Sequence, residues 1–319
     1  MAKEFSHTVP ETEHGIRLDA CIARTGGFGI RKAKRLIADG NVLVDGKIRP
    51  PHCKLEAGSC VTVRETEPVT VLPVPRLAAA NKDYLAFIKP PGIHTAHIAG
   101  GNAPSLERSI ASRWETIRST TMVPENVRIP NFLAPLLPPL TEDGGTGCLW
   151  PPDPPELLSR LDAATSGLVA AAATPEAAAR FKALEVAGSV TKCYLAVVHG
   201  APAGRLVIRN RLDTDNRKKT RVLPESSPDG TRHTELHPLG AATAFSIPEA
   251  DETMCLAAVF IKRGARHQIR AHLAHAGFPL IGDPLYGPAD SPFSLRLHHA
   301  CLAMPGFSAF CLPPWLNIP

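Results

Sequence analysis

The sequence predicts an α+β protein, in which a large domain with a mostly antiparallel mixed sheet follows a small α/β domain. Apolar runs typical of strands outnumber the helical segments, which are interspersed irregularly between them. The chain of 319 residues is long enough for one large core and a small appendage. A proline-containing stretch with few apolar residues separates residues 15–64 from the rest and reads as a linker.

Composition limits the class of protein. The apolar content of 44% is ordinary for a globular domain, and no run of 18 apolar residues could span a membrane. The first residues lack the apolar core of a secretory signal. Eight scattered cysteines without a Cys-x-x-Cys pair indicate reduced thiols in the cytoplasm. A net charge of +5 is compatible with an anionic partner.

The N-terminal part has its own pattern. After a flexible terminus at 1–14, residues 15–64 contain helices at 16–25 and 30–39, a strand at 42–44, a hairpin turn at Asp45-Gly46 and a strand at 61–63. The second helix carries four cations, Arg31, Lys32, Lys34 and Arg35. Such a helix can bind RNA phosphates, although a solvated basic face would have the same composition.

The large domain is expected at 81–319, after a linker at 65–80. A strand at 84–88 leads into the rigid turn Lys89-Pro90-Pro91-Gly92, and residues 106–118 read as a helix. A proline-rich insertion around 124–155 is expected to lack regular structure. Further strands are predicted at 168–173, 192–198 and 254–261, and helices at 175–187 and 264–276, the last with Arg266 and Arg270 on one side.

The stretch from Leu157 to Ala170 holds the first candidate for chemistry. Arg160 and Asp162 flank Leu161, so on an extended segment they point together away from it. Thr165-Ser166-Gly167 suits a tight loop entering the following strand. A carboxylate beside a cation here is either a catalytic group or a structural ion pair.

Four motifs in this order resemble the RluA family of RNA pseudouridine synthases. They are Arg-Leu-Asp-x-x-Thr-Ser-Gly at 160–167, Lys-x-Tyr-x-Ala-x-Val-x-Gly at 192–200, Arg-His-Gln-x-Arg-x-His at 266–272 and Gly-Asp-x-x-Tyr-Gly at 282–287. Residues 15–64 similarly resemble the RNA-binding module of ribosomal protein S4. Ser159 stands where the RluA family has His, and Ala265 is inserted before Arg266.

The resemblance implies a pseudouridine synthase fold and a set of site residues. Asp162 would be the catalytic carboxylate, Arg270 its ion-pair partner and Tyr194 a platform for the target uracil. Arg160 would fill the space left by the flipped base. The remaining implied contacts to substrate or RNA are those of Thr165, Arg266, His267, Gln268 and Lys89.

The expected activity is isomerisation of specific uridines in RNA to pseudouridine by one Asp, without cofactor or metal. A glycoside hydrolase would need a second carboxylate, and Asp283, in a Gly-Asp-Pro context, reads as a turn residue. Ribosomal RNA is favoured over transfer RNA as substrate, and a monomer is expected. Two alternatives remain: an RNA-binding protein that has lost turnover, with Ser159 as the sign, and a metal-dependent nuclease using histidines such as His267, His272 and His275.

Overall fold

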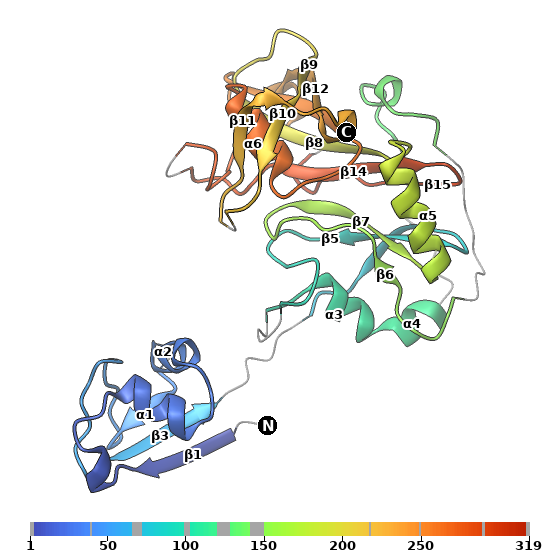
Figure 1. The fold of residues 1–319 in the computed structure, drawn as a ribbon. Coiled ribbons are helices and arrows are strands. Elements are labelled where there is room, and N and C mark those ends of the chain that lie inside the picture. The colour runs from blue at the N-terminus through green and yellow to red at the C-terminus, as the bar shows by residue number, and fades with distance from the viewer. Residues whose placement is uncertain are drawn as a thin grey trace. The chain divides into compact units, whose positions relative to one another are not determined.

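The computed structural model describes residues 3–38, 40–65, 72–98, 103–119, 128–140, 150–216, 218–248, 250–288 and 291–316. The chain divides into two units, Met1–Val71 and Leu72–Pro319, drawn in Figure 1. Within the described ranges, no helix is long and apolar enough to cross a membrane.

The N-terminal unit is a three-stranded antiparallel sheet in the order β1-β3-β2, with two helices. Its apolar residues, among them Leu18, Ile22, Ala33 and Val61, form a separate core. The predicted turn at Asp45-Gly46 is present, since both residues have positive φ and Val44 bonds to Lys47. The elements are β1 (Lys3–Thr8), the 3₁₀ helix η1 (Glu11–Glu13), α1 (Leu18–Thr25), α2 (Ile30–Ala38), β2 (Val42–Val44) and β3 (Cys60–Glu65).

Strand β1 was not expected from the sequence, which suggested a flexible terminus over 1–14. Residues 3–8 instead pair with β3 in continuous register from Lys3↔Glu65 to Thr8↔Cys60. Phe5 packs against the core of the unit. Backbone pairing to β3 orders this segment although its sequence has little apolar alternation. Residue 39, the predicted end of the second helix, lies outside the described residues.

The large unit is organised by a ten-stranded sheet. Its order is β4-β5-β7-β14-β8-β13-β12-β9, with β6 on β7 and β15 on β14. Every pairing in it is antiparallel except that of β7 with β14, so the predicted mostly antiparallel mixed sheet is confirmed. Its strands are β4 (Arg76–Ala80), β5 (Tyr84–Lys89), β6 (Glu156–Leu157), β7 (Ser166–Ala172), β8 (Thr191–His199), β9 (Leu206–Ile208), β12 (Thr234–Ala241), β13 (Met254–Ile261), β14 (Leu297–Met304) and β15 (Phe307–Phe310).

A two-stranded antiparallel ribbon of β10 (Asn210–Asp213) and β11 (Arg221–Ser226) stands outside this sheet. The helices are α3 (Leu106–Ala111), α4 (Trp114–Ser119), α5 (Pro175–Val186) and α6 (Gln268–His275), with 3₁₀ helices η2 (Ala134–Leu136), η3 (Gly230–Arg232) and η4 (Ala242–Phe245).

Two predicted boundaries differ from the structure. The linker expected at 65–80 is shorter, because Glu65 ends β3 and residues 76–80 form β4 against β5. The helix expected at 106–118 is two helices that separate at Ser112 and Arg113. The hydroxyl of Ser109 donates to Ser105 O and that of Ser112 to Ser109 O, and such local bonds compete with continuous helix.

The proline-rich stretch is described at 128–140 and 150–155. Only the short turn η2 is regular in these two ranges. Leu133 is fully buried in a cluster with Leu195 of β8 and Leu256 of β13. Residues 128–140 therefore cover one face of the sheet, whereas Trp150 packs against the main core.

The parallel pairing of β7 with β14 joins the two halves of the sheet. It consists of His298↔Ser166 and His299↔Gly167. Gly167 has φ +111°, and a Cβ there would lie 2.3 Å from the backbone oxygen of His299. Glycine is therefore required where the two strands approach. The loop before β7 and helix α6 after β13 come from opposite halves, and they meet at the candidate site.

Candidate active site

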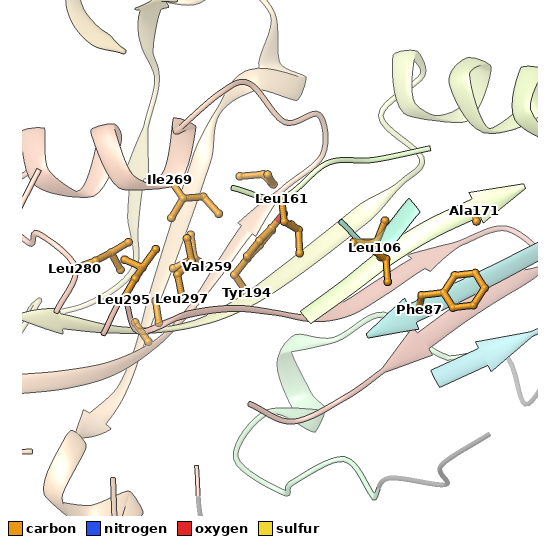
Figure 2. Close-up of a cluster of buried hydrophobic side chains, with 14 of the residues drawn as sticks. Phe87, Leu106, Leu161, Ala171, Tyr194, Val259, Ile269, Leu280, Leu295 and Leu297 are labelled. Atoms are coloured by element: carbon orange, nitrogen blue, oxygen red, sulfur yellow. The ribbon is translucent and has the colours of Figure 1, made fainter. Parts of the chain in front are cut away.

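The loop that carries Asp162 is fixed by its buried neighbours. Leu161 packs in the main core, where Figure 2 shows it beside Tyr194. The hydroxyl of Thr95 donates to Leu161 O and accepts from Leu161 N, both at 2.9 Å. Thr165 N donates to Asp162 O at 3.1 Å and closes a turn. Thr95 was not identified from the sequence.

Arg160 and Asp162, on either side of buried Leu161, line one cavity of about 850 Å³. The Asp162 side chain is 25% exposed, so its carboxylate can reach a ligand. Arg160 is exposed, and Thr165 is buried.

Lys89 supports this loop from inside the protein. Its ammonium donates to three backbone carbonyls, Ala163 O at 3.1 Å, Ile93 O at 2.9 Å and Pro90 O at 3.0 Å. Burial lowers its pKa to about 8, against the opposing effect of the Asp162 charge. The side chain is fully buried, so Lys89 is not the RNA-facing cation expected from the sequence.

Arg270 of α6 holds Asp162 and a second carboxylate. Its NH1 donates to Asp162 Oδ2 at 2.9 Å, while Nε and NH2 donate to Asp283 at 2.8 and 2.7 Å. Burial lowers the pKa of Arg270, but the bonds and charges of Asp283 and Asp162 outweigh burial and raise it overall. The guanidinium therefore stays charged and orients Asp162.

Asp283 is a second residue whose part in the site the sequence did not reveal. It does form the expected turn, since Oδ1 accepts from the backbone N–H groups of Leu285 and Tyr286. Both its carboxylate oxygens also accept from Arg270, and the side chain is buried. Burial acts to raise its pKa, but Arg270 holds it below its ordinary value. Nothing in a Gly-Asp-Pro turn indicates this buried ion pair.

The start of α6 differs from the prediction. The helix begins at Gln268, and His267 before it has φ 53° and ψ 18°, a left-handed conformation. The Gln268 side chain accepts from Ala265 N at 2.9 Å and donates to Arg232 O at 2.8 Å. Because of this turn the helix does not extend back beyond Gln268. Arg266 therefore lies outside the helix and does not share a face with Arg270.

The residues of this turn have different surroundings. Arg266 donates to the backbone oxygens of Thr214 and Asn216, in the loop between β10 and β11. Gln268 is buried and its side chain is bonded to backbone, but it also lines the cavity, so its predicted contact with the substrate stays a prediction. His267 lines the cavity, with Nε2 3.7 Å from Asp162 Oδ2.

Tyr194 of β8 also lines the cavity and is 7% exposed. Its ring stacks on His299, with centroids 4.5 Å apart and an interplanar angle of 16°. Burial, and then the charge of Asp162, raise the pKa of the phenol. Tyr194 therefore presents a neutral aromatic ring, supported from behind, to the cavity that holds Asp162.

Two buried histidines connect the halves of the sheet behind the site. His298 Nδ1 bonds Ser166 Oγ at 2.9 Å, and His299 Nδ1 donates to Leu168 O at 2.6 Å. Burial lowers the pKa of each histidine to about 3. Both rings are neutral in the folded protein at physiological pH.

Acid should therefore destabilise the protein through this pair. The unfolded chain takes up protons at His298 and His299 below about pH 6.5, whereas the folded chain does not until about pH 3. Their stability contribution is thus present above pH 6.5 and lost as the pH falls, by about 2 kcal/mol per histidine between pH 7.5 and 5. In His299→Phe, which keeps a ring against Tyr194, the loss measured by urea unfolding should be smaller than in the wild type by about 2 kcal/mol. Equal pH dependence in the two proteins would contradict the assignment.

The cations of α2 lie opposite its buried residues. Ala33, Leu36 and Ile37 face the core of the N-terminal unit. Arg31, Lys34 and Arg35 are exposed, and Lys32 lies 4.8 Å from the centre of the Phe28 ring. Lys34 is also 3.8 Å from the buried Asp19, which Arg17 holds with two hydrogen bonds. The helix therefore presents Arg31 and Arg35 to solvent, one turn apart.

Family profiles match both units. One described as RNA pseudouridylate synthase matches residues 152–275, which contain Asp162, Tyr194 and Arg270, and one described as S4 domain matches residues 16–59.

Curated relatives match most of the chain. It is 27% identical to RNA pseudouridine synthase 2, chloroplastic, of Oryza sativa subsp. japonica over 90% of this chain and 68% of that protein. It is 25% identical to the ribosomal large subunit pseudouridine synthase D of Escherichia coli (strain K12) over 91% and 78%.

Among solved structures, human RNA Pseudouridylate Synthase Domain Containing 1 has a similar fold. The TM-score is 0.52 at 19% identity, covering 79% of this chain and 88% of that one.

Proposed function

Because this chain belongs to the RluA family of RNA pseudouridine synthases and carries an N-terminal S4 domain, we propose that its substrate is ribosomal RNA and that Asp162 is its essential carboxylate. The enzyme is an isomerase that converts uridine in RNA to pseudouridine. The observation that carries the assignment of the site is the contact of Arg270 NH1 with Asp162 Oδ2 at 2.9 Å, in the cavity that Tyr194 lines.

The proposed roles follow from this geometry. A uridine in folded RNA leaves its stack at a cost of about a few kcal/mol before its ring can be handled. Exposed Arg160 fills the vacated space, and the Tyr194 ring stacks on the uracil, which offsets that cost. Asp162, oriented by its ion pair with Arg270, assists cleavage of the glycosidic bond. The uracil then rotates, and its carbon five bonds to the same ribose.

Ser159 is the residue that raised the alternative of an RNA-binding protein without turnover. Its hydroxyl accepts from Ala170 N at 3.3 Å, so it ties the loop to β7 but supplies no imidazole. Asp162, Arg270 and Tyr194 line the same cavity as Ser159, which supports turnover.

The experiment is to incubate the protein with RNA from a strain that lacks it and to map pseudouridine. New positions in large-subunit ribosomal RNA would support the proposal, new positions only in transfer RNA would overturn the target, and binding without isomerisation would favour the alternative. Chelator-sensitive strand cleavage would indicate a nuclease.

We also propose that the S4 domain increases RNA affinity through Arg31 and Arg35. A substrate with extensive folded structure offers phosphates to both exposed side chains. We further propose a monomeric, cytoplasmic enzyme, in which the buried cysteines Cys21, Cys193 and Cys301 remain free thiols.

The double variant Arg31→Gln/Arg35→Gln should bind transcribed large-subunit ribosomal RNA more weakly. The slope of log affinity against log salt should decrease by roughly 1 to 2, because two phosphate contacts release fewer counterions. Filter binding between 50 and 200 mM salt would measure this effect. Arg180→Gln/Lys182→Gln, which removes two exposed cations of α5, is the matched control. The same slope in the α2 variant and the wild type would exclude α2 from RNA binding.

A further inference from the structure

His267 is held in an unusual conformation beside the reacting carboxylate. It is one of three non-glycine residues with positive φ in the described chain, the others being Asp45 and Ser246. Backbone strain at a residue whose side chain lines an active-site cavity suggests a functional role for that residue. The left-handed backbone directs the imidazole between Tyr286 and Asp162.

The hydrogen bonds around Tyr286 assign the tautomer of His267. The Tyr286 hydroxyl donates its one proton to Thr220 O at 3.2 Å, and its oxygen accepts from Thr220 N at 2.8 Å. His267 Nδ1 lies 3.0 Å from the same oxygen, and with the hydroxyl proton directed to Thr220 O we assign Nδ1 as the donor there. In a neutral ring the proton is then on Nδ1, and Nε2 presents its lone pair to the cavity.

Neutrality follows from the surroundings of the ring. Burial lowers the pKa of His267, and the charge of Asp162 opposes this effect. The positive charges of Arg270 and Arg266 lower the pKa further. The charge of Asp283, like that of Asp162, raises the pKa of His267. A further cation nearby is Lys219, whose Nζ lies 5.1 Å from the centre of the Tyr286 ring. At neutral pH the ring can therefore accept a proton.

Nε2 and the Asp162 carboxylate are two acceptors 3.7 Å apart. At this distance one substrate bound in the cavity can contact both atoms. Pseudouridine formation also removes a proton from uracil C5, and a base separate from Asp162 would leave the carboxylate to act at the glycosidic bond.

We propose that His267 Nε2 is the general base that removes the C5 proton. The inference rests on the proposed function. After C5 has bonded to C1′, the C5–H bond breaks and its proton moves to Nε2. The electron pair restores the C5–C6 double bond and leaves negative charge on N1. N1 then takes the proton from Nε2, which returns the imidazole to its neutral form.

His267→Asn is the discriminating variant. Asparagine tolerates the left-handed conformation, and its amide can still donate to Tyr286, but it offers no base at the position of Nε2. With transcribed large-subunit ribosomal RNA, pseudouridine formation should slow by about 10²- to 10⁴-fold. RNA affinity should remain within about twofold of the wild type, since the change removes an acceptor and no phosphate contact.

The isotope effect separates chemistry from positioning. Transcripts made with [5-²H]uridine should react more slowly than unlabelled ones with His267→Asn, and this effect should exceed that of the wild type. The wild-type rate should fall as acid protonates His267, and the variant should lack this limb, with folding checked by circular dichroism at each pH. Tyr286→Phe, which removes the acceptor at Nδ1, should show a smaller loss and keep the acid limb.

Several results would overturn the inference. They are a wild-type rate in His267→Asn, or a slow variant that keeps the wild-type isotope effect and acid limb. If His267→Asn does not fold, an unchanged rate and isotope effect in Tyr286→Phe would overturn it as well. A wild-type protein that forms no pseudouridine overturns the proposed function, whereas an active wild type with an unaltered C5 step overturns only the role of His267.

Discussion

Asp162→Asn should abolish pseudouridine formation while the protein remains folded and still binds RNA. The amide has the shape of the carboxylate and can still accept from Arg270, but it has no charge with which to assist cleavage of the glycosidic bond. We expect the rate to fall by roughly 10⁴-fold or more, a loss typical of removing a reacting group. Release of tritium from [5-³H]uridine in transcribed large-subunit ribosomal RNA measures this rate.

Asp153→Asn is the matched control, because it neutralises an exposed carboxylate a few residues away in the sequence. It should retain the wild-type rate. If Asp162→Asn retained more than about a tenth of the rate while folded, Asp162 could not be the essential carboxylate.

Arg270→Gln should cost both activity and stability. The substitution removes the donor to Asp162 and leaves the buried Asp283 without its ion-pair partner. Breaking a buried pair in this way typically lowers the free energy of unfolding by about 3–5 kcal/mol. Urea denaturation measures stability, and tritium release measures the remaining isomerisation.

The double variant Arg270→Gln/Asp283→Asn separates the two effects. Neutralising Asp283 removes the uncompensated charge, so stability should partly return, whereas activity should not, because Asp162 still lacks its partner. Arg118→Gln, which breaks a surface pair with Glu115, should change stability by less than about 1 kcal/mol. A stable Arg270→Gln protein would show that Asp283 is not held by this pair.

The sequence predicts a structural element correctly where the residues of that segment alone determine its conformation. The strand at 254–261, the Asp45-Gly46 turn and the proline-initiated helix at 175 depend on local periodicity and turn chemistry, and they are present as predicted. The short strands β4, β9 and β15 are weak patterns on their own: β4 and β15 are defined by pairing with the neighbouring strands β5 and β14, and β9 by pairing with the more distant β12.

The site follows the same division. The residues flanking Leu161 could be identified from alternation, and Arg270 and Tyr194 from motifs. The internal hydrogen bonds of Lys89 and Gln268 could not be predicted. A polar residue near a motif can contact a ligand or bond to the protein's own backbone, and the sequence does not distinguish the two. Only the folded chain shows that the Lys89 ammonium binds Ala163 O and that Asp283 shares Arg270 with Asp162.

The parallel contact of β7 with β14 has a mechanical consequence. Two strand pairs, the Ser166–His298 bond and the His299–Leu168 bond join the sheet halves there, and the Arg270–Asp162 pair spans the same boundary. Because the two charges needed for the reaction come from different halves of the sheet, the reactive geometry depends on this boundary, which the apolar core shared by β5, β7, β14 and β15 also holds together.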